Sequence, residues 1–508
     1  MALAAAVAGC GRDAGDTSPI VVVGIDGGEW SVIERLWGEG RLPNLRRVAE
    51  EGTTAPLATA YGVSPAIWTT IATGYPPGIH GITGFAIAGP KGDVPVSSSV
   101  RRVPALWNLA SAAGRRVAVL GWYATWPVEP VDGLIVSDHV MRRELDERLH
   151  PPERLPEIEA RLAAIRELSE ESMFPLNAER VGPRGRRDVL VEELLPEVAA
   201  AGYDLVLAYF RTVDHLSHLF WDYYEPEAFD EVDPEDAEAK ARLIPAAYER
   251  IDRVIGRLRE TAPRATLLIV SDHGFNATPD TVRISLDMDT LLERLGYLER
   301  DGAGIDMRRT RAFVRASSKL NPRKTLRFAV RGEVEGGGVA PEELPALRRQ
   351  LSAVLESLVY AGGDPVFAVT EDGDGLVAQV QRRGLSWDVY REGRRLEDFG
   401  IGIRRISGGH AADKHGIFLA AGPTVVPDAP LGEIGIHDLA PTLLYALGLP
   451  VAEDFVGAPV ESLFTDAFRA RRPLRTVPTW RMERPAGART SAADEEILEE
   501  LRALGYLQ

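Results

Sequence analysis

Apolar residues are distributed along the chain in two alternating patterns. Short uninterrupted runs, often β-branched, are typical of strands buried on both faces of a parallel sheet. They predict strands at Ile20–Ile25, Arg116–Gly121, Tyr203–Phe210, Ala265–Val270 and Gly416–Ala421. Between them, apolar residues recur at helical spacing. Strands that alternate with helices imply an α/β fold with a mostly parallel central sheet covered by helices on both faces.

The stretches with helical spacing predict helices at 30–51, Ser64–Thr73, Arg187–Ala201 and Ala241–Thr261. The first is expected to break and restart at Leu42–Leu45, because Pro43 interrupts it. In the second, Ser64 is expected near the N-cap and Pro65 at the first helical position, where the missing N–H of proline costs little.

The pattern changes at about residue 280. A helix at Pro341–Leu358 and short strand-like pieces at Gly375–Arg382 and Trp387–Glu392 predict an inserted α+β subdomain at 280–400. The expected organisation is a signal remnant and tether (1–18), a main domain (19–279 and 401–470), the insertion (280–400) and a tail (471–508) with a helix at Ala492–Leu504.

Composition excludes some classes of protein. The 508 residues are 45% apolar and 26% charged, as in an ordinary soluble globular protein. A net charge of −17 argues against nucleic acid as the main partner, because proteins that bind it carry basic faces. The single cysteine, Cys10, excludes a disulfide scaffold and a thiolate metal cluster.

The N-terminal segment ends its short apolar run at Cys10. Val7-Ala8-Gly9-Cys10 resembles a bacterial lipobox, which predicts lipid modification of Cys10 and an exported lipoprotein anchored to the membrane of the cell envelope. No Lys or Arg precedes the apolar run, which departs from a signal peptide. The alternative is an Ala-rich N-terminus with a chance cysteine.

Candidate ligands lie beside the predicted strands. In open α/β sheets, ligands bind at the carboxyl ends of the strands. Acidic and imidazole side chains lie there, or just before the fifth strand: Asp26, Asp214, His218, Asp272, His273 and His410. Asp214 and His218 are spaced i, i+4, so a helical turn would put them on one face. Carboxylate and imidazole groups together suit zinc.

One hydroxyl accompanies these side chains. Ser64 stands at a predicted helix start, where backbone N–H groups and the helix dipole favour anions. A second Ser-Asp-His segment, within Leu134–Val140, lies outside the order of the other candidates and has Val140 where the later segment has a glycine. We therefore expect Asp138 and His139 to be structural.

The ordered set resembles the alkaline phosphatase superfamily, specifically its type I phosphodiesterase/nucleotide pyrophosphatase branch. The resembling segments are Val23–Gly28, Ser64–Ile82, Asp214–His218, Ser271–Phe275, Gly409–His410 and Ile436–Gly448. They span residues 20–465, apart from most of the insertion. The resemblance implies an alkaline-phosphatase-like three-layer sandwich and a hydrolase of small phosphate esters, either diesters or monoesters.

The resemblance also implies a site with two divalent metal ions, either Zn²⁺ or Mn²⁺. One ion would be held by Asp214, His218 and His410. The other would be held by Asp26, Asp272 and His273, with Ser64 bridging toward it. Ser64 would be the nucleophile and would form a phosphoserine intermediate.

Two departures from the branch and one rival ligand bear on this interpretation. The branch often has an Asn shortly beyond the nucleophile, where Ile67 and Trp68 stand in this chain, and Pro65 has no N–H to donate to a phosphoryl oxygen. His415 competes with His410 as a ligand.

Other functions remain open at this point. The same residues would suit an envelope transferase of phospho-groups or a phosphomutase. A binding protein whose metals are structural is the alternative that is not an enzyme.

Overall fold

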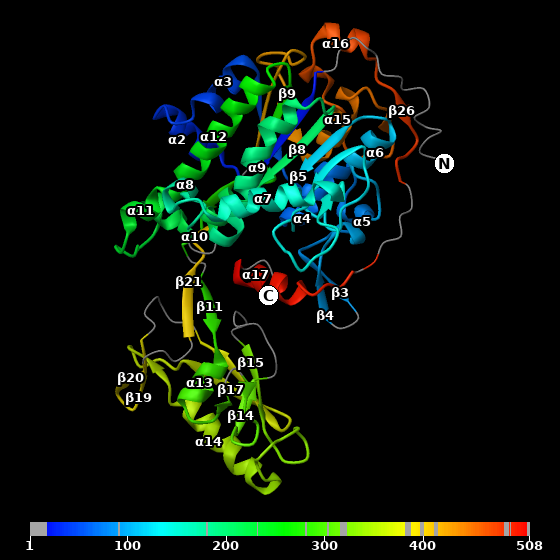
Figure 1. Cartoon of the computed structure of the whole chain (residues 1–508). Helices are drawn as coiled ribbons and strands as arrows, with labels where there is room; N and C mark the ends of the chain where they lie inside the picture. Colours follow the sequence, from blue (N-terminus) through cyan, green and yellow to red (C-terminus); the bar gives the residue numbers. More distant parts are fainter. Residues whose placement is uncertain are drawn as a thin grey trace. The chain divides into compact units, whose positions relative to one another are not determined.

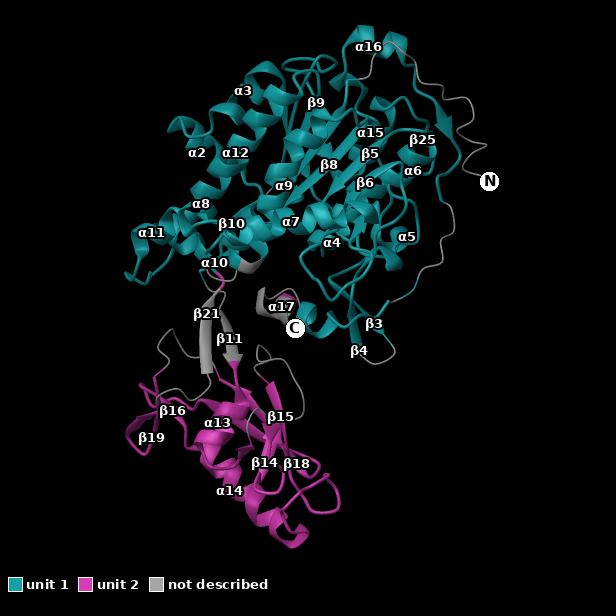
Figure 2. Ribbon diagram, in the orientation of Figure 1, with its two compact units in different colours: residues 1–279, 407–498 teal, residues 280–406, 499–508 magenta. Residues whose placement is uncertain are grey.

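The computed structural model (Figure 1) describes residues 18–89, 92–178, 181–230, 232–279, 282–301, 304–314, 323–381, 388–396, 401–410, 415–481, 487 and 489–504. Cys10 lies outside these ranges. The chain divides into two compact units (Figure 2), residues 1–279 with 407–498 and residues 280–406 with 499–508. No helix within the described ranges has the length and hydropathy needed to cross a membrane.

Unit 1 is built on a nine-stranded sheet of order β24-β2-β23-β9-β1-β8-β5-β6-β7. The strands are β1 (Ile20–Ile25), β2 (Thr53–Ala58), β5 (Val117–Leu120), β6 (Gly133–Val136), β7 (Leu149–His150), β8 (Leu205–Phe210), β9 (Thr266–Val270), β23 (Gly416–Ala421) and β24 (Ile434–Gly435). The central strand β1 is parallel to β8 and β9, and all six of its residues are buried. The five runs expected to be strands are β1, β5, β8, β9 and β23.

Strand β23 runs antiparallel to β9 and β2. Its amino end therefore lies at the edge of the sheet where β1, β8 and β9 have their carboxyl ends. A short strand just before it, β22 (Gly408–His410), pairs with β10 (Phe275–Ala277), which follows β9. This reversal brings residues far apart in the sequence to one edge of the sheet.

Helices cover the sheet in two groups (Figure 1). The first packs through mutual contacts of α2 (Trp30–Gly38), α3 (Pro43–Glu51), α7 (Leu155–Arg166), α9 (Gly182–Ala200), α10 (Thr212–Tyr224) and α12 (Leu243–Thr261). The second contains α4 (Ser64–Thr73), α5 (Pro77–His80), α6 (Leu106–Ala112) and α15 (Leu439–Ala446). The predicted α/β fold, a mostly parallel sheet between two helical layers, is confirmed.

The start of α4 and four strands of the sheet, β2, β6, β7 and β24, differ from the expectation. Val63 is the N-cap of α4, so Ser64 is the first helical residue and Pro65 the second. Strand β2 was not expected, because its alternating burial and Pro56 hide it from a search for continuous apolar runs. The break before α3 lies at Leu42, as predicted.

Unit 2 has its own hydrophobic core. A four-stranded antiparallel sheet contains β14 (Ala312–Val314), β15 (Arg323–Phe328), β18 (Gly375–Val380) and β17 (Phe367–Asp372). Helix α14 (Leu344–Glu356) packs on β17 and β18 through buried Leu347, Leu351 and Leu355. A separate pair joins β11 (Val282–Leu286) to β21 (Ile401–Arg405).

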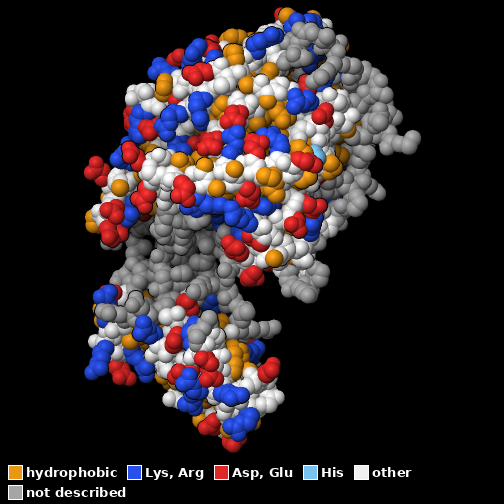
Figure 3. Space-filling view, viewed as in Figure 1, with side chains coloured by type: hydrophobic (Ala, Val, Ile, Leu, Met, Phe, Trp, Pro, Cys, Tyr) orange, Lys and Arg blue, Asp and Glu red, His pale blue; other side chains and the backbone are white. Residues whose placement is uncertain are grey.

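The described surface carries both charge signs. Figure 3 shows acidic and basic side chains interspersed over the face drawn of unit 1. The C-terminal helix α17 covers Asp494–Leu504, close to the predicted range.

A cluster of aromatic side chains packs α4 against the sheet. Trp68 of α4 is fully buried, and its ring centroid lies 4.9 Å from that of Tyr209 and 5.1 Å from that of Trp122. Gly24 of β1 makes room for it, because a Cβ there would lie 2.7 Å from Trp68 Cζ3. The indole therefore excludes any side chain at position 24.

We expect Gly24→Ala to lower the free energy of unfolding by about 1–3 kcal/mol, because the added methyl group must displace a tightly packed indole. Gly38→Ala is the control, since nothing lies within 4 Å of a Cβ there. Denaturant unfolding followed by tryptophan fluorescence measures both variants. Equal stability of the two would contradict the packing argument.

Candidate functional site

Three aspartates gather at the carboxyl ends of neighbouring strands. Asp26 directly follows β1, Asp272 lies two residues beyond β9, and Asp214 lies in the first turn of α10, after β8. All three are almost fully buried. Because β8, β1 and β9 are adjacent and parallel, their ends deliver these carboxylates to one place.

His273 lies at the centre of the cluster. Its Nε2 is 3.3 Å from Asp272 Oδ2, 3.6 Å from Asp26 Oδ1 and 3.9 Å from Asp214 Oδ1. The potential ligand atoms of Asp26, Asp272 and His273 all lie within 4.8 Å of one another. This trio is the first candidate metal group.

A second candidate group forms around Asp214. Asp214 Oδ1 lies 3.4 Å from His218 Nε2 and 3.5 Å from His410 Nε2. The ligand atoms of Asp214, His273 and His410 also lie within 4.8 Å of one another. His273 thus belongs to both groups, and its ring stacks on that of His410 with centroids 3.6 Å apart.

Backbone carbonyls orient the imidazoles. His218 Nδ1 lies 2.8 Å from Gly408 O, and His273 Nδ1 lies 3.1 Å from Gly274 O. Each Nδ1 must carry its proton to donate to a carbonyl, so each Nε2 presents a lone pair to the carboxylates. Burial lowers the pKa of His273, which keeps it neutral, as a metal ligand must be.

Burial and mutual repulsion raise the pKa of two of the carboxylates. Burial, followed by the negative charge of Asp214, raises the pKa of Asp26 to about 6. Burial and Asp26 likewise raise the pKa of Asp272. Within the described ranges, Asp26 Oδ1, Asp272 Oδ2 and His410 Nε2 are buried without a hydrogen-bond partner. A cation among these atoms would relieve the cost of burying them, and this mixed oxygen and nitrogen set suits zinc or manganese.

Ser64 borders the first group. It is buried at the first residue of α4, and its Oγ lies 3.4 Å from His273 Nε2. The hydroxyl therefore lies where a helix N-terminus, an imidazole and the carboxylate cluster meet. This position suits a nucleophile that attacks an anionic group.

Three supporting residues were missed by the sequence analysis. The Tyr209 hydroxyl donates to Asp26 Oδ2. Glu29 accepts from the backbone N–H of Phe275 at 3.0 Å, which ties the turn after β1 to β10. Asp188 of α9 accepts from the backbone N–H groups of Arg211 and Thr212, both at 3.0 Å, and so holds the start of α10. Only Glu29 had a sequence signal, as an acidic residue directly after Asp26-Gly-Gly.

The structure separates His415 from the cluster. His415 is 41% exposed, and its Nε2 lies 2.6 Å from Glu433 Oε2. His410 lies beside Asp214 instead.

The earlier Ser-Asp-His segment is tied to a nearby turn. Asp138 accepts from the backbone N–H groups of Ala124 and Trp126, at 2.9 and 3.1 Å, and the His139 ring packs edge-on against Trp126. Both residues thus hold together the turn between β5 and β6.

His80 has a structural role. Its Nδ1 accepts from the N–H of Ile82, and its Nε2 lies 3.1 Å from the Thr70 hydroxyl. Burial, followed by the charge of Arg101, lowers the pKa of His80 to about 3. His80 therefore stays neutral and fastens α5 to α4.

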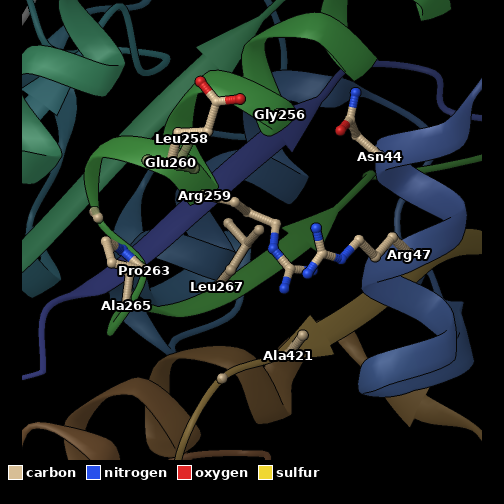
Figure 4. Close-up of a pocket in the computed structure, with 12 residues that line it drawn as sticks. Asn44, Arg47, Gly256, Leu258, Arg259, Glu260, Pro263, Ala265, Leu267 and Ala421 are labelled. Carbon is tan, nitrogen blue, oxygen red and sulfur yellow. The ribbon is translucent and has the colours of Figure 1, made fainter.

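A separate cavity of about 330 Å³ contains none of these residues (Figure 4). It lies at the amino end of β9, with Ala265 and Leu267 in its wall. Its two arginines, Arg47 and Arg259, both pair with Glu51. The charge that would attract an anionic ligand is thereby partly neutralised.

A sequence model described as type I phosphodiesterase / nucleotide pyrophosphatase matches residues 20–401. No curated protein matches the chain.

Similar solved structures include human ectonucleotide pyrophosphatase/phosphodiesterase 5, at 16% identity and a TM-score of 0.43, covering 88% of this chain and 100% of that one. The murine protein, in an inactive form with AMP, has 15% identity and a TM-score of 0.42, with the same coverage. Phosphonoacetate hydrolase from Sinorhizobium meliloti 1021, in complex with phosphonoformate, has 16% identity and a TM-score of 0.43, covering 85% of this chain and 95% of that one.

We expect Asp188→Ala to weaken metal binding by about 10- to 100-fold, because α10 then loses the carboxylate that fixes its first turn and with it Asp214. Titration of the metal-free protein with Zn²⁺ measures this change. The matched control is Asp252→Ala, since Asp252 holds the start of α3 in the same way by accepting from the N–H groups of Asn44 and Leu45. Equal Zn²⁺ affinity in both variants would contradict a positioning role for Asp188.

Proposed function

The chain belongs to the type I phosphodiesterase/nucleotide pyrophosphatase family of phosphoric ester hydrolases, and we propose that it works through two divalent metal ions with Ser64 as its nucleophile. The observation that carries this proposal is the convergence of three buried aspartates and three histidines beside one serine hydroxyl. A set of carboxylates this close together is costly to bury unless cations bind it.

We assign the ligands as the family resemblance implies. Asp214, His218 and His410 would hold one ion, and Asp26, Asp272 and His273 the other. Two such cations, most suitably Zn²⁺, would favour ionisation of the Ser64 hydroxyl and stabilise charge on the leaving oxygen.

Ser64 would carry the covalent step. Its Oγ attacks phosphorus, an Oγ–P bond forms, and the P–O bond to the alcohol breaks, so that the alcohol leaves. Water then cleaves the phosphoserine and releases phosphate or a phosphomonoester. The position of Ser64 at the start of α4 supports this role, because this helix is packed through Trp68 on Tyr209 and Trp122 and holds the Ser64 hydroxyl 3.4 Å from His273 Nε2.

We expect Ser64→Ala to lower hydrolysis of p-nitrophenyl phosphate or bis-p-nitrophenyl phosphate by about 1,000-fold or more, because the nucleophile is lost. Metal content, measured by elemental analysis, should stay at the wild-type value. Ser31→Ala is the matched control, since Ser31 also lies in a first helical turn but is exposed in α2.

Full activity of Ser64→Ala would remove Ser64 from the mechanism. If the wild type binds both metals but hydrolyses neither ester, a phospho-group transferase, a phosphomutase or a binding protein becomes the better interpretation.

We also propose that the protein is an exported lipoprotein, on the evidence of the Val7–Cys10 segment alone. In a bacterial host, the wild type should separate with the membrane fraction and Cys10→Ser with the soluble fraction, because the cysteine would carry the lipid. Mass spectrometry of the mature N-terminus tests the same point. An unmodified Cys10 in the wild type would contradict the proposal.

A further inference from the structure

Arg211 lies beside the candidate site and has no role in the proposed mechanism of Ser64 and the metal ions. It directly follows β8 and lies three residues before Asp214. Ile25 of β1 is in register with Phe210 of β8, and the N–H of Asp26 donates to Phe210 O at 2.9 Å. Arg211 and Asp26 therefore leave the sheet side by side at its carboxyl edge.

The Arg211 guanidinium rests on aromatic rings rather than on a carboxylate. Its Cζ lies 5.0 Å from the centroid of Tyr123 and 5.8 Å from that of Tyr209, the tyrosine that donates to Asp26. Within the described part of the chain, its side chain forms no ion pair and no hydrogen bond. The five N–H donors of the guanidinium are thus available to a ligand.

Arg187 provides a contrast on the same ring. Its Cζ lies 5.3 Å from the Tyr209 centroid, but its Nη2 is 2.6 Å from Asp188 Oδ1. One arginine is therefore neutralised by a carboxylate in direct contact, whereas the other forms no ion pair in the described part of the chain and interacts with the charges of Asp26 and Asp138 only at longer range.

Arg211 is charged in this setting. Burial disfavours its charge, but the nearby Tyr209, Tyr123 and Asp26 outweigh burial and raise the pKa of the guanidinium above its usual value. The Arg211 charge in turn opposes the rise of the Asp26 pKa that burial causes. A charged guanidinium that is held in no ion pair keeps its N–H donors available for an anionic ligand.

We propose that Arg211 binds the non-bridging oxygens of the substrate phosphoryl group, and that it favours phosphomonoesters over phosphodiesters. This inference rests on the proposed phosphohydrolase function. The planar fork of arginine matches two phosphoryl oxygens at once. Arg211 would supply the phosphate donors that the segment after Ser64 lacks, because Pro65 has no N–H and no Asn stands at Ile67 or Trp68.

The preference for monoesters follows from charge. A phosphomonoester is mostly a dianion at neutral pH, since its second pKa is about 6. A phosphodiester carries one negative charge, and its second ester group replaces an oxygen that the guanidinium would otherwise contact. The loss of Arg211 should therefore cost more for the monoester.

The test compares kcat/KM of the metal-loaded full chain on p-nitrophenyl phosphate and bis-p-nitrophenyl phosphate. We expect Arg211→Ala to lower the monoester value by about 100-fold and the diester value by less than about 10-fold. Arg211→Lys keeps the charge but loses the fork, so its monoester value should fall between those of the wild type and Arg211→Ala. Metal content and Tm, measured alongside, should match the wild type.

Arg116→Ala is the matched control. The Arg116 guanidinium also lies over a tyrosine ring, 4.6 Å from the centroid of Tyr203, but at the amino end of β5. Its ratio of monoester to diester activity should stay at the wild-type value. Equal losses on both esters in Arg211→Ala, or no loss on either, would overturn the assignment of Arg211.

Failure of the proposed function gives a different result. A wild type that binds metals but hydrolyses neither ester would overturn the hydrolase. In that case, calorimetry with inorganic phosphate tests the role of Arg211. The affinity of the protein for phosphate must fall about 10-fold or more in Arg211→Ala. Unchanged phosphate affinity would overturn the assignment of Arg211 as well.

Discussion

The main physical constraint on the candidate site of unit 1 is the repulsion among three buried carboxylates. Asp26, Asp214 and Asp272 lie around His273 in a region where water is largely excluded, and burial is the largest influence raising the pKa of Asp26 and Asp272. Hydrophobic burial of the strands and their ladder of hydrogen bonds hold the three together against this repulsion. Cations bound among these carboxylates would relieve the repulsion, and they would place positive charge where an anionic ester could bind.

Neighbouring elements hold these ligands in place. Asp188 reaches from α9 to the start of α10, Glu29 reaches from the turn after β1 to β10, and Gly408 O accepts from His218. Each contact joins segments that are distant in the sequence, so a shift of one element would move a ligand. Preorganisation of this kind replaces the reorganisation that solvent would undergo during the reaction.

The positive charges around the cluster have separate roles. Arg187 is neutralised by Asp188, whereas Arg211 lies over the Tyr123 and Tyr209 rings and forms no ion pair in the described part of the chain. The same Tyr209 ring lies near both, and its hydroxyl is committed to Asp26. This difference separates the residues that hold the site from the one that we propose to bind the substrate, within a family of phosphoric ester hydrolases.

The sequence by itself determined the strands of the sheet core and the side chains at their ends. Strands such as β1 and β9 must be apolar throughout because both of their faces are covered, so Ile20–Ile25 and Ala265–Val270 were readable without a structure. Ser64, Asp26 and Asp272 could be singled out because the order of such residues resembles a known family.

Only the tertiary structure decided which distant residues meet. The antiparallel direction of β23, the pairing of His410 with Phe275, and the supporting roles of Asp188 and Tyr209 depend on which elements become neighbours. The local sequence does not specify which elements become neighbours, because packing across the whole sheet determines it.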